Sequence, residues 1–130
     1  NPVRHILDLK RVVLVDDSIV RGTTSRKIVH MVRSAGATEV PMRIACPPTI
    51  SPCFYGVDTP STSELIAANN TVEEIRRFVE ADTLSYLPLS KLREAVGDDK
   101  HEYCYACYTG DYPTELINIE ELMTARAGRG

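Results

Sequence analysis

One stretch of sequence decides the fold of this chain: Val12-Val13-Leu14-Val15-Asp16-Asp17-Ser18-Ile19-Val20-Arg21-Gly22-Thr23-Thr24. Its first residues belong to a short, β-branched apolar run, residues 11–15, and this run ends abruptly at two acids. Such a run is typical of a strand that is buried on both faces in a parallel sheet. We therefore predict a central strand that ends at Asp16, followed by a loop over residues 18–23 that leads directly into a helix.

The residues after the loop predict a helix and a second strand. Residues 24–35 place apolar side chains at helical spacing, and Gly36 follows as a residue suited to the position just past a helix. Residues 39–46 are apolar enough for a strand. Strand, loop, helix and strand make a βαβ unit with a right-handed crossover, so the fold class is α/β with a parallel sheet.

Beyond Pro47-Pro48 the sequence becomes proline-rich and irregular, and we expect the sheet to end near there. Short helices are predicted over residues 63–68, 71–80 and 90–96, the second from the capping box Thr71-Val72-Glu73-Glu74 and the third with a stop at Gly97. Residues 83–87 predict one last short strand. We divide the single domain into two parts. Residues 1–60 hold the sheet and the loop, and residues 61–130 form a helical, irregular segment that contains a cysteine knuckle, residues 104–107.

The acid pair and the loop form the candidate site, because ligands of open α/β sheets bind at the carboxyl ends of the strands. Loop N–H groups, loop hydroxyls and the positive end of the helix dipole suit a phosphate, and Gly22 lets the backbone approach closely. Asp16 and Asp17 can accept hydrogen bonds from vicinal ribose hydroxyls and hold a hard cation. A sugar phosphate with a divalent cation satisfies both halves of the site.

A simpler interpretation treats Asp16 and Asp17 as acids that end a strand, and residues 18–24 as an ordinary loop. Each feature alone favours that interpretation. The combination is far more specific, because apolar residues, two acids and a Gly-Thr-Thr loop in this order resemble the signature of the type I phosphoribosyltransferases, which bind 5-phosphoribosyl-1-pyrophosphate (PRPP).

Composition argues against several other classes of protein. The 130 residues include 18 acidic and 15 basic ones, with a formal charge of -3 and no long basic run, so a nucleic-acid partner is not expected. No apolar stretch approaches the roughly 18 residues of a membrane span, and no signal peptide is visible. We expect a cytoplasmic protein without a membrane partner, and a first residue other than Met suggests a processed or excised piece.

Among the type I phosphoribosyltransferases, the loop sequence resembles that of the glutamine phosphoribosylpyrophosphate amidotransferases. Other purine and orotate transferases usually carry Glu-Asp at the acid pair and a shorter loop. This chain has Asp16-Asp17 and a longer loop sequence, as the glutamine amidotransferases do. The resemblance extends over essentially the whole chain, through residues 35–37, 47–48, 52–58, 64–67, 81–87 and 104–110. The implied fold is the carboxy-terminal part of a type I phosphoribosyltransferase core.

The resemblance implies an enzyme that hydrolyses glutamine in a separate domain and passes the ammonia to this one. Ammonia then displaces pyrophosphate from C1 of PRPP and gives 5-phosphoribosylamine, the committing step of purine synthesis, with Mg2+ neutralising the leaving group. The chain contains neither an amino-terminal Cys nucleophile nor the upstream pyrophosphate loop and lid of the family. We therefore expect this piece to be inactive alone and the intact protein to be a homo-oligomer.

The resemblance also assigns roles to single residues. Asp16 and Asp17 hold the ribose hydroxyls and Mg2+. The loop for the 5-phosphate consists of Ser18, Ile19, Val20, Arg21, Gly22, Thr23 and Thr24. For Arg21 the sequence leaves two roles open, added charge near the loop or a solvated position.

The four cysteines leave several interpretations open. Two disulfides would need an oxidising compartment, and no feature of the sequence indicates one. A site with all four thiolates would suit zinc. Bacterial members of one branch of the family carry a 4Fe-4S cluster, and the resemblance puts Cys53, Cys104 and Cys107 at three ligand positions, with the fourth upstream of Asn1. Cys46 is expected to be a small buried residue at a strand end, and the other three to lie near one another.

Two functions of other classes were weighed against the transferase. A non-catalytic, PRPP-binding regulatory module would use the same fold, but a DNA-binding segment would be expected beside it. A zinc-knuckle interaction domain would leave residues 16–24 without a purpose. The histidines His5, His30 and His101 show no catalytic spacing and are expected at the surface.

Overall fold

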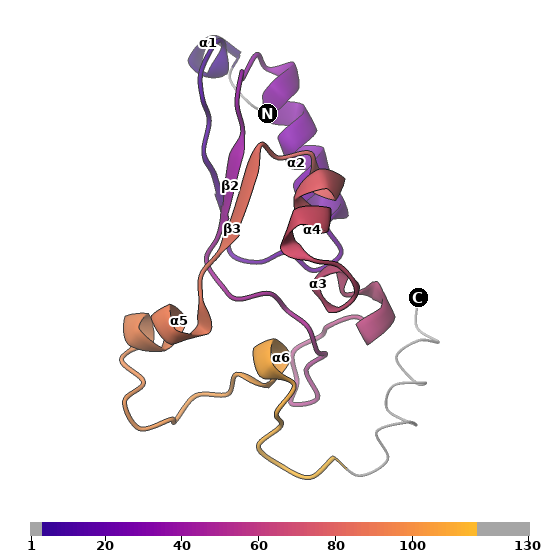
Figure 1. Ribbon diagram of the computed structural model, residues 1–130, viewed down its shortest axis with the longest axis vertical. Coiled ribbons are helices and arrows are strands. Elements are labelled where there is room, and N and C mark those ends of the chain that lie inside the picture. Colours follow the sequence, from indigo (N-terminus) through magenta and orange to yellow (C-terminus); the bar gives the residue numbers. More distant parts are fainter. Residues whose placement is uncertain (1–3, 117–130) are drawn as a thin grey trace.

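The computed structural model describes residues 4–116 as an elongated arrangement of short helices around a small sheet (Figure 1). The elements in chain order are α1 (Arg4–Leu7), β1 (Leu14–Asp16), α2 (Thr23–Ser34), β2 (Pro41–Ile44), η1 (Thr62–Glu64), α3 (Ile66–Asn69), α4 (Val72–Val79), β3 (Thr83–Tyr86), α5 (Leu89–Val96) and α6 (Ala106–Thr109). None of the helices in this part of the chain is long and apolar enough to cross a membrane.

The sheet has three parallel strands in the order β1-β2-β3. In its register Leu14 pairs with Met42 and Met42 with Leu84, and an isolated bridge from Arg11 to Glu39 extends the first pair. The predicted βαβ unit, β1-α2-β2, is therefore confirmed. The predicted strand over residues 83–87 is also confirmed as β3, but the expectation that the sheet ends near Pro48 is wrong, because β3 joins it on the far side of β2.

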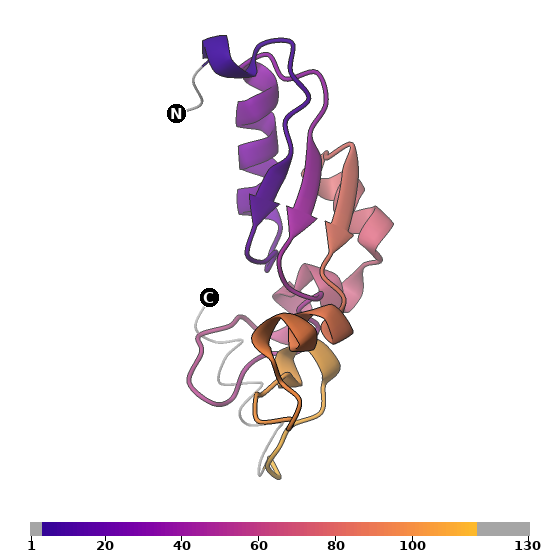
Figure 2. The same cartoon turned by 90° about the vertical axis from the view of Figure 1, so that its left-hand side faces the viewer.

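Helices α2 and α4 cover one face of the sheet, and Figure 2 shows the opposite face turned toward the viewer without a covering layer. Apolar side chains of the two helices and of the strands meet between these layers and form the core. Its buried members are Ile19, Val29, Val32, Val40, Met42, Ile44, Cys46, Ile75, Val79, Ala81 and Leu84. Because α4 and β3 follow residue 60, both halves of the chain contribute to this one core.

The prediction that the strand ending at Asp16 is central and buried on both faces is wrong for the described chain. β1 is an edge strand, and the side chains of Val13 and Val15 are 54% and 74% exposed. Alternate residues of a strand point to opposite faces, so Leu14 packs on the core while its neighbours point away from it. The β-branched run gave the strand correctly, but its second face has no layer of its own in residues 4–116.

The helix ends follow the sequence signals closely. Thr71 accepts a hydrogen bond from the Glu74 N–H at 3.2 Å, and the Glu74 carboxylate accepts one from the Thr71 N–H at 2.7 Å, which is the predicted capping box of α4. Gly36 after α2 and Gly97 after α5 both have positive φ, as their positions after a helix predict.

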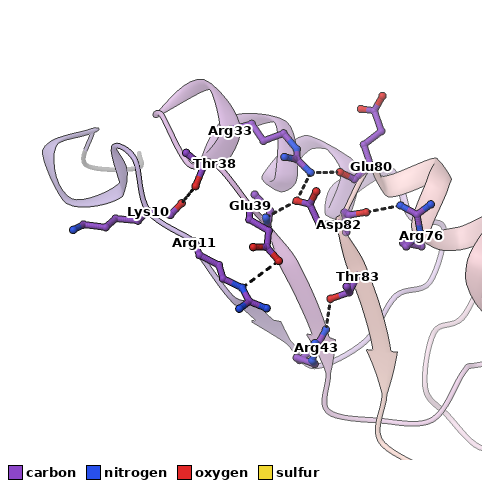
Figure 3. A network of polar contacts seen from close by, with 12 residues as sticks. Lys10, Arg11, Arg33, Thr38, Glu39, Arg43, Arg76, Glu80, Asp82 and Thr83 are labelled. Carbon is purple, nitrogen blue, oxygen red and sulfur yellow. Dashed lines mark hydrogen bonds and ion pairs between the residues drawn. The ribbon is translucent and has the colours of Figure 1, made fainter.

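A network of polar contacts holds the amino-terminal ends of the strands together (Figure 3). The Asp82 carboxylate accepts hydrogen bonds from the Val40 N–H at 2.6 Å and from Arg33 at 2.7 Å, and Arg33 also donates to the Glu80 carbonyl at 2.8 Å. These contacts, the Val40 N–H first, hold the pKa of Asp82 below its usual value. The network ties α2, β2 and the start of β3 together at the end of the sheet opposite to the acid pair.

Candidate functional site

The acid pair lies where β1 ends. The Asp16 carbonyl still takes part in the sheet, since it accepts a hydrogen bond from the Ala45 N–H at 2.9 Å. One oxygen of the Asp16 carboxylate accepts the Asp17 N–H at 2.9 Å, and one oxygen of the Asp17 carboxylate accepts the Ser18 hydroxyl at 3.1 Å. These short-range bonds orient both carboxylates at the carboxyl end of the strand, as the sequence predicts.

Both acids line a cavity of about 350 Å³ together with most of the predicted loop. The lining residues are Asp16, Asp17, Ser18, Val20, Arg21, Gly22, Thr23, Thr24 and Ser25. The side chain of Ile19 lies elsewhere, in the core at 1% exposure, so this residue anchors the loop from below. Ser25 was not identified from the sequence, although it continues the hydroxyl run of Thr23 and Thr24 on the first turn of α2.

The amino-terminal end of α2 opens on this cavity. Gly22 is the N-cap residue, with φ of +82°, and no side chain caps the helix. The first turn begins with the bond from the Arg26 N–H to the Gly22 carbonyl at 3.0 Å, so the N–H groups before Arg26 have no partner within the helix. Uncapped N–H groups at the positive end of a helix dipole form a natural site for an anion.

Gly22 is required at its position for two reasons. Its positive φ is costly for residues with a Cβ, and a Cβ built there would lie 2.9 Å from Ile66 Cδ1 and 3.0 Å from Phe78 Cε1. The loop therefore packs directly against α3 and α4. A hydrogen bond from the Ile66 N–H to the Val20 carbonyl at 3.0 Å also joins the loop to α3.

Arg21 lies beside the loop with an exposed side chain, a position that fits either of the two roles that the sequence left open. Its guanidinium is paired with the Glu64 carboxylate, which accepts from Nε at 3.2 Å and from Nη2 at 3.1 Å. The two side chains are 55% and 40% exposed, so the pair lies at the rim of the cavity. The positive charge beside the loop is thus matched by a negative one, and sequence reasoning missed Glu64 because it lies 43 residues away.

Cys53, Cys104 and Cys107 line a second cavity of about 570 Å³, next to the first one. The two cavities share Ser18 and Val20 in their walls. The expectation that the three cysteines lie near one another is met to this extent, but no group of three or more His, Cys, Asp or Glu in residues 4–116 is arranged to hold a metal ion. Burial, followed by the neighbouring Cys53 and Cys104, raises the pKa of the Cys107 thiol.

Cys46 lies outside this cavity but not far from it. It is 7% exposed in the core just past β2, which agrees with its predicted place at a strand end. Burial raises the pKa of the Cys46 thiol, and Tyr108, which packs against the core, lies beside both Cys46 and Cys107. Cys46 is therefore linked to the cysteine knuckle through a tyrosine, a contact that the sequence did not predict.

Hydrogen bonds already fasten the cysteine knuckle to the segment that carries Cys53. The Cys107 carbonyl accepts from the Ile50 and Ser51 N–H groups at 2.9 and 3.1 Å, and the Tyr112 hydroxyl donates to the Pro52 carbonyl at 2.7 Å. The Tyr112 and Phe54 rings are in contact, with centroids 5.2 Å apart. The three histidines are exposed, as expected.

Comparison with known proteins gives a consistent result, although no protein-family model matches the chain. It is 58% identical over 128 residues to the chloroplastic amidophosphoribosyltransferase of Glycine max, covering 98% of this chain and 22% of that protein. It is 55% identical over 118 residues to the amidophosphoribosyltransferase of Bacillus subtilis (strain 168), covering 88% of this chain and 25% of that protein. The chain thus spans about a quarter of the length of these relatives.

Solved structures agree with the sequences. The glutamine PRPP amidotransferase from B. subtilis, complexed with ADP and GMP, superimposes with a TM-score of 0.84 at 53% identity, over 90% of this chain and 27% of that one. The α/β fold predicted from the sequence is thereby confirmed as the fold of this family. The expected cytoplasmic location does not hold for all relatives, since the plant proteins are described as chloroplastic.

Proposed function

Because this chain belongs to the amidophosphoribosyltransferase family, we propose that it is the PRPP-binding part of an enzyme that transfers glutamine-derived ammonia to PRPP. The product is 5-phosphoribosylamine, for purine biosynthesis. The observation that carries the proposal is the single cavity in which the acid pair, the loop and the uncapped end of α2 meet. The alternative of a non-catalytic PRPP-binding module has less support, because the relatives compared above are named as transferases.

The two ends of the cavity match the two ends of a ribose phosphate. Loop and helix N–H groups, with the hydroxyls of Thr23, Thr24 and Ser25, bind the 5-phosphate, which is an anion rich in acceptors. Asp16 and Asp17 accept hydrogen bonds from the ribose hydroxyls. Held in this way, C1 faces ammonia in a fixed orientation, and positioning supplies much of the rate when the substrate needs no covalent help from the protein.

Mg2+ is the expected cofactor, and the chemistry of the acid pair fits it. Carboxylate oxygens are hard ligands, and Mg2+ is usually held by one or two carboxylates plus substrate phosphates and water. Asp16 and Asp17 supply two such groups at the cavity. When bound, the ion neutralises charge on the departing pyrophosphate.

The intact enzyme is expected to form 5-phosphoribosylamine from PRPP, Mg2+ and ammonia, and to release one pyrophosphate per product. This 130-residue chain alone is expected to give no product, because it spans about a quarter of its relatives. Pyrophosphate release, followed in a coupled assay with and without ammonia, measures both. Pyrophosphate release by the intact enzyme that did not depend on ammonia or glutamine would contradict the proposal.

We further propose that Cys53, Cys104 and Cys107 are ligands of a 4Fe-4S cluster in the longer protein. Thiolates are soft ligands that suit iron-sulfur clusters, and all three thiols line one cavity beside the PRPP loop. Three thiols leave one cluster position to a residue outside this chain. Hydrogen bonds from Ile50 and Ser51 to the Cys107 carbonyl hold the knuckle beside the segment that carries Cys53, which supports a shared site.

The intact protein, purified without oxygen, is expected to contain about four iron and four acid-labile sulfide per chain. Cys104→Ser and Cys107→Ser should each remove most of both, whereas Cys46→Ser should retain them because its side chain lies outside the cavity. Metal analysis and sulfide analysis of the four proteins make the comparison. Stoichiometric zinc with neither iron nor sulfide would replace the cluster by a zinc site.

A further inference from the structure

The loop that lines the first cavity, residues 18–24, is called the anion loop below. Its residues 20–22 each contact either residues 61–66 or α4. The Val20 carbonyl accepts the Ile66 N–H at 3.0 Å, and the side chains of Ile66 and Phe78 leave no room for a Cβ at Gly22. Between them, Arg21 donates twice to the Glu64 carboxylate. The loop that would bind the phosphate therefore takes its shape from a segment far along the chain.

The Glu64 side chain is itself held in place, because each of its carboxylate oxygens accepts hydrogen bonds from a different residue. Oε1 accepts both hydrogen bonds from Arg21, at 3.2 and 3.1 Å. Oε2 accepts the Ser61 N–H at 3.3 Å and the Ser61 hydroxyl at 3.1 Å, in the capping box of η1. The Arg21 contact, followed by Ser61, keeps the pKa of Glu64 below its usual value, so the carboxylate is ionised at neutral pH.

We propose that Glu64 is a positioning residue for the anion loop and that Arg21 is its anchor, not a ligand of the phosphate. Held by Glu64, the guanidinium of Arg21 stays at the rim, and the backbone N–H groups of the loop keep their arrangement toward the cavity. The inference rests on the function proposed above. It adds that the PRPP affinity depends on a carboxylate that does not touch PRPP.

The two possible roles of Arg21 predict opposite effects of Glu64→Gln. The amide has the shape of the carboxylate and lacks its charge. If Arg21 anchors the loop, loss of its partner loosens the loop and weakens PRPP binding. If Arg21 were a phosphate ligand restrained by Glu64, loss of the partner would free a positive charge and strengthen binding.

Steady-state kinetics of the intact enzyme test this directly. Glu64→Gln, Arg21→Gln and Arg21→Lys are each expected to raise the KM for PRPP about fivefold, as the loss of one rim ion pair permits, with kcat within about twofold. The double variant Glu64→Gln with Arg21→Gln should be no worse than either single one, since both remove the same contact. Glu94→Gln breaks an exposed pair with Lys91 on α5 and should leave the KM unchanged.

A lower KM in Glu64→Gln, or a wild-type KM in that variant, would overturn the proposal. So would additive effects in the double variant, because they would show that Arg21 and Glu64 act on PRPP separately. Failure of the underlying function is distinguishable, because it would appear in the Asp16 and Asp17 variants described below and not in these.

Discussion

Replacement of Asp16 and Asp17 together by asparagine in the intact enzyme is expected to lower phosphoribosyl transfer about a thousandfold or more. Both residues line the cavity at the end of β1, and both lose the charge that would hold Mg2+ and the ribose hydroxyls. The fold should tolerate the change, because an asparagine oxygen can still accept the Asp17 and Ser18 hydrogen bonds seen at this site. Glutamine hydrolysis, in a separate domain, should remain measurable.

Two assays on the same preparations make this result interpretable. Glutamate release reports glutamine hydrolysis, and pyrophosphate release with ammonia as the donor reports transfer alone. Asp99→Asn serves as the control, since this exposed carboxylate lies after α5 and outside the cavity. Transfer near the wild-type rate in the double variant would refute the roles of the acid pair, and with them the proposed site.

The second large effect is expected for Gly22→Ala. An alanine at φ of +82° costs about 1 kcal/mol, and crowding of its Cβ against Ile66 and Phe78 adds about 1 kcal/mol or more. The strained φ and the crowding both favour a movement of the loop away from α3 and α4, and such a movement displaces the N–H groups of the cavity. We expect a lower melting temperature and a rise in the KM for PRPP of about tenfold or more.

Gly97→Ala is the matched control for this variant. Gly97 has a similar φ of +67°, but a Cβ there meets nothing within 4 Å and lies after α5, away from the loop. It should lower the melting temperature slightly and leave the KM for PRPP unchanged. A Gly22→Ala enzyme with wild-type KM would mean that the shape of the loop does not govern PRPP binding.

The sequence alone determined the βαβ unit and the place of the acid pair, because these features depend on neighbouring residues. Apolar periodicity gave α2, the abrupt change from Val15 to Asp16 ended β1, and the capping box started α4. Each signal acts within one or two turns of chain. The loop at the carboxyl end of a parallel strand followed from the same local pattern, and so did most of the residues that line the cavity.

Only the tertiary structure decided which distant residues meet. Glu64 reaches Arg21 across 43 residues, Tyr108 links Cys46 to the cysteine knuckle, and Ile19 turns from the loop into the core. The order of the strands likewise depends on pairing between remote segments, so an apolar run could announce β1 but not its edge position or its exposed face. Local sequence fixes what a segment becomes, whereas its neighbours in space, chosen by packing of the whole chain, fix what it touches.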